Sequence, residues 1–415
     1  MNRVPKLRFK EFTDEWEEKR FDELVKKEKK ITYGVVKPGE FCDDGIFLIK
    51  ASDYSKGWNL ENLFKISREL DFSYKRSKVG EGDILFTIVG SVGNTAIVPK
   101  YLENSNITQQ TARLSIDSNF FSNIFIYNFL STIPNRKQTL NYLKEGVQPS
   151  INLSDLEKFK IFIPNLQEQQ KIANFLSNVD KKISITEEKL GLFNEYKKGI
   201  MQKIFNQELR FKDENGNEYP EWEEFTLGQI GDTYNGLTGK SADDFGKGKK
   251  YITYKNIFDN TKIDTSILEF VEVKENEKQN KVEYGDIFFT VSSETPDEVG
   301  YTSVLLDKIN EDIYLNSFCF GYRLKSKEDF YPEFFRYVLR SFSFREKIYI
   351  LAQGSTRFNL SKTEVLKIKL NLPCFEEQQK ISDFLSAIDT KIEKISDELK
   401  NLKEFKKGLL QQMFV

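Results

Sequence analysis

The stretch EQQKIANFLSNVDKKISITEEKLGLFNEYKKGIMQKIF, residues 168–205, aligns without a gap with EQQKISDFLSAIDTKIEKISDELKNLKEFKKGLLQQMF, residues 377–414. In both copies, apolar side chains recur at alternating steps of four and three. A seam of about 3.5 residues per repeat over about five heptads predicts two coiled-coil helices, each burying its stripe on a partner. The predicted seam residues are Ile172, Leu176, Val179, Ile183, Leu190, Phe193, Ile200 and Ile204 in the first copy, and Ile381, Leu385, Ile388, Ile392, Ile395, Leu399, Leu402, Leu409 and Met413 in the second.

One lysine interrupts each apolar stripe, Lys197 in the first copy and Lys406 in the second. Each lysine could fix the register of the helix pair or extend its charged end to solvent, and we favour the second interpretation. The link from residue 205 to residue 222 is short, so an antiparallel pair needs the least connecting chain. We therefore expect two similar globular heads at opposite ends of a rigid helix pair.

The Glu-Gln-Gln phrase opens each predicted helix, after Pro164 in the first copy and Pro373 in the second. An acidic residue suits the positive N-terminal end of a helix. Helix initiation with a polar contact is the favoured role for this phrase, and direct contact with a ligand is the alternative.

The duplication continues upstream of the predicted helices. GDILFT at residues 82–87 matches GDIFFT at residues 285–290, and LRFK begins at both Leu7 and Leu209. A period of about half the chain has the size of a repeated domain rather than of a solenoid repeat. The sequence therefore predicts four segments: a first globular domain at 1–166, a first helix at 167–206, a second globular domain at 207–374 and a second helix at 375–415.

The expected fold class is α+β, with two similar mixed α/β domains joined by two long antiparallel helices that form a coiled coil with an internal pseudo-two-fold repeat. Alternating and buried apolar patterns predict strands within each domain. These strands are expected within residues 46–54, 82–90 and 111–116, and within residues 251–257, 285–293 and 317–324. Aromatic stretches with helical spacing occupy residues 120–133 and 332–344.

The composition removes several kinds of catalytic site. The chain has 415 residues and 0 histidines, which excludes Ser-His-Asp hydrolases and His-containing zinc sites. Gly239-Lys240-Ser241 and Asp244-Phe245-Gly246 resemble fragments of nucleotide-binding motifs, but the rest of each motif is missing. The three cysteines, Cys42, Cys319 and Cys374, are far apart in the sequence and are expected to be small buried hydrophobes.

No apolar stretch is long enough for a membrane helix, and a cytoplasmic location is expected. The remaining hypothesis is a binding and positioning protein, for which duplex DNA is a suitable extended ligand. The net charge of −2 is low for a chain that grips DNA alone, so we expect clustered basic residues or a partner that completes the clamp.

Each of the two long predicted helices opens with a Glu-Gln-Gln phrase that follows a proline, and each globular domain has a Gly-Asp-Ile strand motif. With these features and with Gly90-Ser91-Val92-Gly93, the chain resembles the specificity subunit of type I restriction-modification systems. The resemblance covers nearly the whole chain. It implies a non-catalytic subunit in which each globular domain is a target-recognition domain that reads one half of a split DNA sequence. It also implies two methyltransferase subunits and ATP-driven restriction subunits as partners. S-adenosylmethionine, ATP and magnesium would then be bound by those partners, and no cofactor by this chain.

Under this resemblance, base-reading residues should be polar and should differ between the two domains where the scaffold agrees. For any one of these residues, the alternative is that it is polar only because it lies on a surface loop. For the whole chain, the alternative is a cytoplasmic coiled-coil scaffold whose two heads bind proteins. Divergence between the domains predicts an asymmetric target. The DNA-binding candidates are Lys50, Ser52, Asp53, Ser91, Asn94, Gln109, Gln110 and Gln148 in the first domain, and Thr253, Lys255, Asn256, Ser292, Ser293, Asn316, Ser317, Thr356 and Arg357 in the second.

Overall fold

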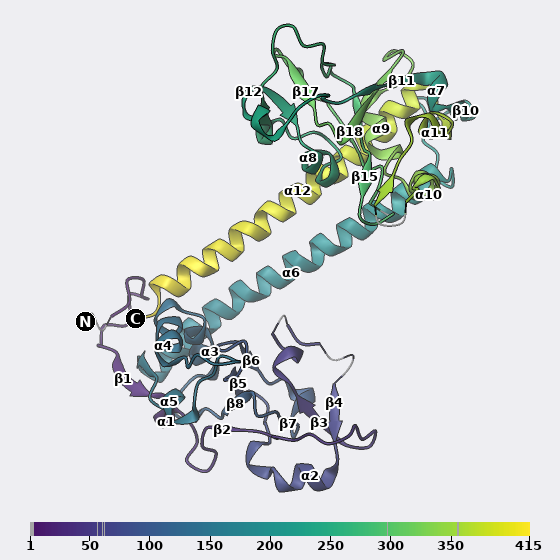
Figure 1. Cartoon of the computed structure of the whole chain (residues 1–415). Coiled ribbons are helices and arrows are strands. Elements are labelled where there is room, and N and C mark those ends of the chain that lie inside the picture. The colour runs from purple at the N-terminus through teal and green to yellow at the C-terminus, as the bar shows by residue number, and fades with distance from the viewer. Residues whose placement is uncertain (1–3, 56, 60, 62, 297, 355–356) are drawn as a thin grey trace. The chain divides into compact units, whose positions relative to one another are not determined.

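The computed structural model describes residues 4–55, 57–59, 61, 63–296, 298–354 and 357–415. The chain forms two compact units, Met1–Glu188 with Asp397–Val415, and Lys189–Ser396. The long helices α6 (Leu166–Phe205) and α12 (Phe375–Gln412) both cross this division (Figure 1). Each unit is therefore a globular domain together with the start of one long helix and the end of the other.

Unit 1 holds a four-stranded sheet in the order β2-β8-β5-β6, a three-stranded sheet in the order β4-β3-β7 and the pair β1-β9. Its strands are β1 (Glu17–Arg20), β2 (Thr32–Tyr33), β3 (Ile46–Ile49), β4 (Phe64–Ile66), β5 (Ile84–Thr87), β6 (Thr95–Ile97), β7 (Asn106–Ile107), β8 (Thr111–Leu114) and β9 (Lys160–Ile163). Its helices are α1 (Phe21–Leu24), η1 (Ala51–Asp53), α2 (Arg68–Ser73), η2 (Lys75–Ser77), η3 (Lys100–Leu102), α3 (Asn123–Leu130), α4 (Ile133–Tyr142) and α5 (Leu153–Leu156).

Unit 2 repeats this topology strand for strand, with sheets β11-β18-β14-β16, β13-β12-β17 and β10-β20, and adds the pair β15-β19. Its strands are β10 (Glu223–Thr226), β11 (Gly231–Asn235), β12 (Phe245–Ile252), β13 (Glu269–Val271), β14 (Ile287–Thr290), β15 (Ser292–Ser293), β16 (Thr302–Val304), β17 (Ile313–Leu315), β18 (Cys319–Leu324), β19 (Phe358–Asn359) and β20 (Lys369–Leu372). Its helices are α7 (Leu227–Ile230), η4 (Ala242–Asp244), α8 (Tyr254–Asp259), η5 (Thr265–Ile267), α9 (Pro332–Val338), α10 (Phe342–Leu351) and α11 (Lys362–Leu366).

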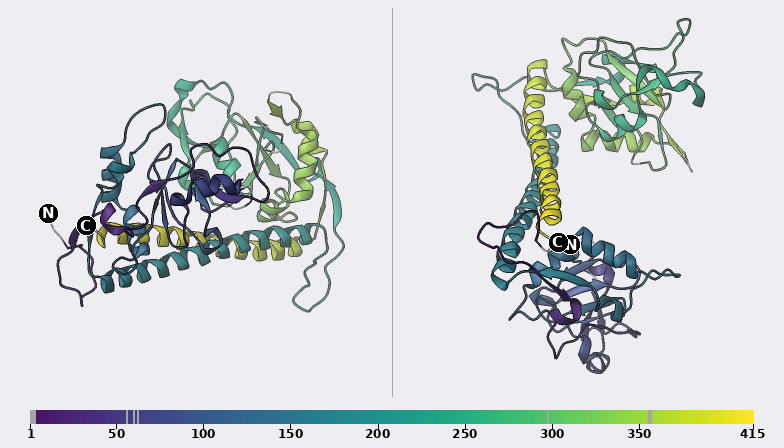
Figure 2. Two further views of the ribbon diagram at one scale, coloured as in Figure 1. Left: turned by 90° about the horizontal axis from the view of Figure 1, so that it is seen from below. Right: turned by 90° about the vertical axis from the view of Figure 1, so that its left-hand side faces the viewer.

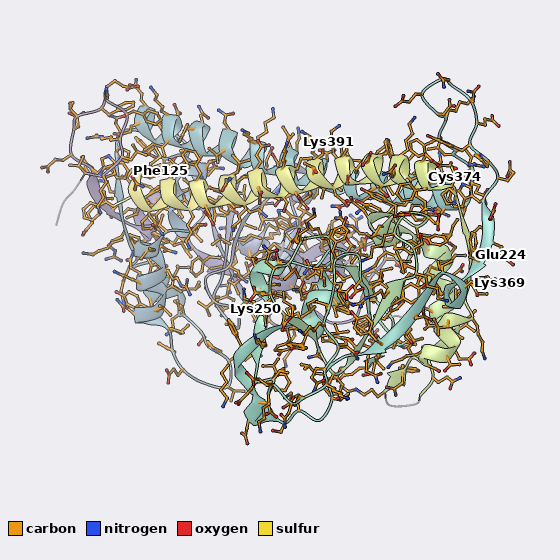
Figure 3. The ribbon with its side chains drawn as sticks, turned by 90° about the horizontal axis from the view of Figure 1, so that it is seen from above. Phe125, Glu224, Lys250, Lys369, Cys374 and Lys391 are labelled. Atoms are coloured by element: carbon orange, nitrogen blue, oxygen red, sulfur yellow. The ribbon has the colours of Figure 1, made fainter. Side chains whose placement is uncertain are left out.

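The correspondence extends to strand direction and to surface contacts. The pair β3-β7 is parallel in unit 1, as is its counterpart β12-β17 in unit 2. The antiparallel pair β10-β20 carries a 2.6 Å ion pair between Glu224 and Lys369 (Figure 3), and Glu18 with Lys160 on β1-β9 does the same at 2.7 Å. Duplication of one domain explains why the same ladders recur in the same order.

Within each unit the two long helices pair antiparallel. In unit 1, Lys182 contacts Glu398 at 3.3 Å and Lys406 contacts Asp180 at 2.5 Å, so residues later on α6 meet residues earlier on α12. The predicted long helices and their antiparallel pairing are thus confirmed. Within unit 1, the segment around Leu7 lies beside the end of α12 (Figure 2), where the Leu7 N–H donates to the Gln412 carbonyl at 2.9 Å.

Each long helix contributes to the core of a globular domain. In unit 1, Leu176 near the start of α6 and Phe414 after α12 pack with Phe125 of α3, which is labelled in Figure 3. In unit 2, Ile381 near the start of α12 and Ile204 at the end of α6 pack in the same way. The helices are therefore built into the two domains rather than appended to them.

Four predictions of local secondary structure were wrong. The expected strand at residues 46–54 ends at Ile49, before η1, and the aromatic stretch at residues 332–344 is divided between α9, which ends at Val338, and α10, which begins at Phe342. The expected strand at residues 251–257 ends at Ile252, because the Thr253 side chain accepts a bond from the Asn256 N–H and starts helix α8. The aromatic stretch at residues 120–133 is not one helix: α3 ends at Leu130, and α4 begins at Ile133 with proline in its first turn.

Candidate nucleic-acid interface

The Glu-Gln-Gln phrase attaches the start of each long helix to a globular domain. In unit 1, the buried Glu168 carboxylate accepts two hydrogen bonds from Arg8, at 2.8 Å each. Gln169 accepts a bond from the Ser122 N–H and donates one to the Pro164 carbonyl, both at 2.9 Å. The bond from Glu168 raises the pKa of Arg8 above its ordinary value.

Unit 2 repeats this network with its own copies of the motif. Glu377 accepts two 2.9 Å bonds from Arg210, and Gln378 joins the Tyr331 N–H to the Pro373 carbonyl, each at 2.9 Å. These side chains are buried and fully engaged inside the protein. The phrase is therefore a structural anchor, in agreement with the favoured interpretation of the sequence.

The Gly-Asp-Ile motif is also structural. In unit 2, Asp286 accepts bonds from Arg323 Nε and Nη2 at 2.8 and 2.7 Å, and these bonds raise the pKa of Arg323. In unit 1, Arg113 Nε lies 4.0 Å from Asp83, and its guanidinium donates instead to backbone carbonyls. Each aspartate precedes a central strand and lies beside an arginine of the neighbouring strand, so its contacts are made inside the protein.

Several predicted DNA-binding residues of unit 2 gather at one pocket. Ser292, Ser293 and Arg357 line a surface pocket of about 380 Å³. Glu294, which follows Ser292 and Ser293 where the two copies differ in sequence, also lines the pocket. The sequence did not single out the other lining residues, which are Tyr254, Phe258, Glu298 and Phe318. Phe318 could have been found, because it follows the predicted Asn316 and Ser317.

The aromatic wall of this pocket is rigidly supported. Tyr254 and Phe258 are stacked with ring centroids 6.1 Å apart, and Phe258 packs on Tyr301 at 4.9 Å. Arg340 lies over Tyr301 at 4.5 Å and donates to the backbone carbonyl of Phe258 at 3.2 Å. The Tyr254 hydroxyl donates to the Ser292 carbonyl at 2.9 Å, which ties the wall to strand β15.

The structure corrects the prediction for Asn256. This side chain is fully buried: its amide donates to the Asp264 carbonyl at 2.8 Å and its oxygen accepts from the Asp264 N–H at 3.1 Å. It therefore presents no polar atom to a base. Thr253 is engaged as the cap of α8, and Ser293 donates to Glu298 at 2.7 Å.

The remaining candidates of unit 2 are more exposed. Lys255 is exposed but forms a 2.6 Å ion pair with Asp259. Asn316 is half-buried and accepts a bond from the Phe318 N–H, while Ser317 and Arg357 are exposed. Thr356 lies outside the described residues.

In unit 1, the candidates lie on loops around the end of β5. Ser91, Gln109 and Gln148 are exposed, while Asn94 and Gln110 are half-buried. Backbone bonds bring their loops together: Asn94 and Gln110 accept from the N–H groups of Thr87 and Ile88, at 2.8 Å each.

The candidates on η1 in unit 1 are more constrained. Asp53 accepts bonds from the Lys50 N–H at 2.8 Å and from the exposed Ser52 hydroxyl at 3.2 Å. The Lys50 ammonium lies over the Phe64 ring at 4.5 Å. The amide-bearing loops of unit 1 are thus freer to meet a ligand than the charged groups of η1.

The predicted seam lies on the inner side of the helices. Each of its residues is buried or half-buried, from fully buried Leu176 and Ile381 to half-buried Leu190 and Leu402. Exposed apolar residues of these helices, such as Leu192 at 59% exposure, lie outside the predicted stripe.

The favoured interpretation of the two stripe lysines was wrong. Lys197 forms an ion pair with Asp389, which also accepts bonds from Arg336 at 2.9 Å and from the Tyr337 hydroxyl at 3.0 Å. Lys406 pairs in the same way with Asp180. Since the lysine side chains are only 21% and 24% exposed, they specify register between the helices rather than reaching into solvent.

The described part of the chain contains no group of three or more His, Cys, Asp or Glu residues arranged to hold a metal ion. Among the helices that the structure describes, none has the length and apolar character needed to cross a membrane.

A family model for the type I restriction modification DNA specificity domain matches the chain twice, at residues 13–191 and 219–404. Each match contains one of the repeated domains together with most of the long helix that follows it. The chain therefore belongs to this family. DNA sequence recognition is the function that the family defines, and the repeated fold described above is its fold.

Curated relatives agree with this assignment. The chain is 32% identical over 204 residues to the type I restriction enzyme EcoBI specificity subunit of Escherichia coli, a match that covers 47% of this chain and 42% of that protein. It is 28% identical to the putative type I restriction enzyme MjaX specificity subunit of Methanocaldococcus jannaschii, over 79% of this chain and 76% of the relative. The MjaVIII specificity subunit of the same organism is 24% identical, over 96% and 91% of the two chains.

Two solved structures share the fold. The S subunit of a type I restriction-modification system from M. genitalium matches with a TM-score of 0.57 at 19% identity and covers 99% of both chains. A chain from a study of the complex assembly and conformational transition of the type I R-M system also matches with a TM-score of 0.57, at 16% identity over 95% of this chain and 96% of that one.

Proposed function

We propose that this chain is the DNA-reading subunit of a type I restriction-modification complex, and that each unit reads one half of a split, asymmetric target. The observation that carries the proposal is the duplication of one topology with unlike loop chemistry. Unit 1 presents amide side chains such as Gln109 and Gln148, while unit 2 presents Arg357 beside a pocket with aromatic walls. Amides suit adenine and arginine suits guanine, so the two half-sites should differ.

In this proposal the chain catalyses no reaction and binds no cofactor. Two methyltransferase subunits would bind S-adenosylmethionine and modify adenine, and restriction subunits would bind ATP and magnesium. The low net charge of −2 supports a complex in which the methyltransferase subunits supply many of the contacts to DNA phosphates, because a protein that neutralises many phosphates alone is usually more basic. The long helices are the proposed place where the methyltransferase subunits attach.

The test is to co-express the chain with the methyltransferase subunit of its restriction-modification system and to sequence the host DNA for modified adenines. A split, asymmetric motif supports the proposal. Exchanging residues 207–374 for the same domain of another specificity subunit should change one half of the motif and keep the other. Unmodified DNA, or a short continuous motif, would contradict the proposal and favour a scaffold whose heads bind proteins.

A further inference from the structure

Strands β15 and β19 bring two opposite charges to the rim of the unit 2 pocket. In this antiparallel ladder, Ser292 pairs with Asn359 and Ser293 pairs with Phe358. Glu294 directly follows β15 and Arg357 directly precedes β19, so the two residues flank the same end of this short ladder. Both residues line the pocket.

Neither charge is used elsewhere in the described part of the chain. The side chains of Arg357 and Glu294 form no hydrogen bond or ion pair with any described residue, although the Arg357 backbone carbonyl accepts a bond from the Asn359 side-chain amide at 3.2 Å. Glu298 accepts from Ser293, and Lys255 is paired with Asp259. The two side chains flank the end of a strand pair that is tied to the aromatic wall, and together they form a recognition pair at one pocket.

We infer that this pair recognises a single G·C base pair in the half-site read by unit 2, with Arg357 bound to guanine and Glu294 bound to cytosine. In the major groove, guanine presents the O6 and N7 acceptors, which match the two-pronged guanidinium. Cytosine presents the N4 amino donor, which matches a carboxylate. A G·C pair thus offers acceptors beside a donor, and the pocket offers a donor group beside an acceptor group. This inference rests on the proposed function.

In the described part of unit 1, no arginine–glutamate pair corresponds to Arg357 and Glu294. Gln148 occupies the loop that matches the Arg357 loop, and the charged candidates Lys50 and Asp53 are engaged with Phe64 and with the start of η1. The G·C requirement therefore belongs to the half-site of unit 2.

The experiment uses the full chain with its methyltransferase subunits and determines the modified motif across the host genome for each variant. Arg357→Ala should relax this G·C position by about 5- to 150-fold in discrimination, the range for one bidentate base contact. Glu294→Ala, which removes the acceptor for the cytosine amino group, should relax the same position. Arg357→Lys should also relax it, because lysine keeps the charge but loses the two-pronged geometry. The half-site of unit 1 should remain unchanged in all three variants.

Lys274→Ala is the matched control, because it removes one exposed positive charge from unit 2 away from the pocket. It should leave the motif unchanged. A unit 2 half-site without a G·C pair, a motif unaffected by Arg357→Ala, or full retention of discrimination in Arg357→Lys would each overturn the inference. Failure of the proposed function is distinguishable from these results, since the wild-type chain would then produce no split motif.

Discussion

Replacing Gln378 by alanine should loosen the start of α12 from the second globular domain. The Gln378 side chain is 1% exposed, and its amide joins the Tyr331 N–H to the Pro373 carbonyl with two 2.9 Å bonds. Alanine leaves both backbone groups without these partners. A buried polar group without a partner costs about 1–3 kcal/mol, so the expected loss in the free energy of unfolding is about 2–6 kcal/mol. For a unit of this size, that loss corresponds to a fall in Tm of roughly 4–24 °C.

Thermal unfolding of the purified chain measures this loss, and hydrogen–deuterium exchange locates it. Exchange should rise at the Tyr331 amide, which loses its acceptor. The control is Gln379→Ala, which makes the same chemical change at an exposed position in the same helical turn and should alter stability by at most about 0.5 kcal/mol. Equal effects of the two variants, or unchanged exchange at Tyr331 in Gln378→Ala, would refute the assignment of this motif as an anchor.

Two further predictions concern the aspartates of the Gly-Asp-Ile motif and two tyrosines of unit 2. Asp286→Asn removes the carboxylate that holds Arg323 and should lower the free energy of unfolding by about 2–4 kcal/mol, allowing for the partly exposed guanidinium. Asp83→Asn should cost less because its arginine partner lies 4.0 Å away, and urea unfolding that ranked the two variants in the opposite order would contradict this reasoning. Burial raises the pKa of Tyr251 and of Tyr331 to about 12, so the stability that depends on their neutral hydroxyls is complete below pH 10 and is lost as the pH rises to 12. Tyrosine absorbance and the unfolding midpoint, followed together from pH 9 to 12, check this prediction, and a constant midpoint would contradict it.

The long helices and the duplication were predictable because their signals are local or repetitive. A heptad pattern places Leu176 and Leu385 on the same stripe whatever the rest of the chain does, and two aligned copies exclude chance. The strand at Gly285-Asp286-Ile287 was predictable for a similar reason: the turn needs glycine, which has φ +84° here, and the buried residues after it form a short apolar run. These features depend on neighbours in sequence.

The candidate site was only partly predictable. Arg357 and Asn256 look alike in sequence, as polar residues on loops that differ between the copies, yet the first is exposed at a pocket and the second is fully buried. Glu294 gained its importance only from the structure, in which it lines the same pocket as Arg357. Lys197 was misjudged because its partner, Asp389, lies far away in sequence.

The sequence by itself thus determined the repeat, the two long helices and the stripe along which they pair. The reason is that the regular spacing of apolar residues along a helix decides which of its faces is buried. The tertiary structure alone decided which polar side chains are used inside the protein and which remain free. In the Glu-Gln-Gln phrase, Gln378 is buried while Gln379 is exposed, although both are glutamines of the same helical turn. The difference arises because a polar group is engaged only when folding brings a distant donor or acceptor within hydrogen-bond distance.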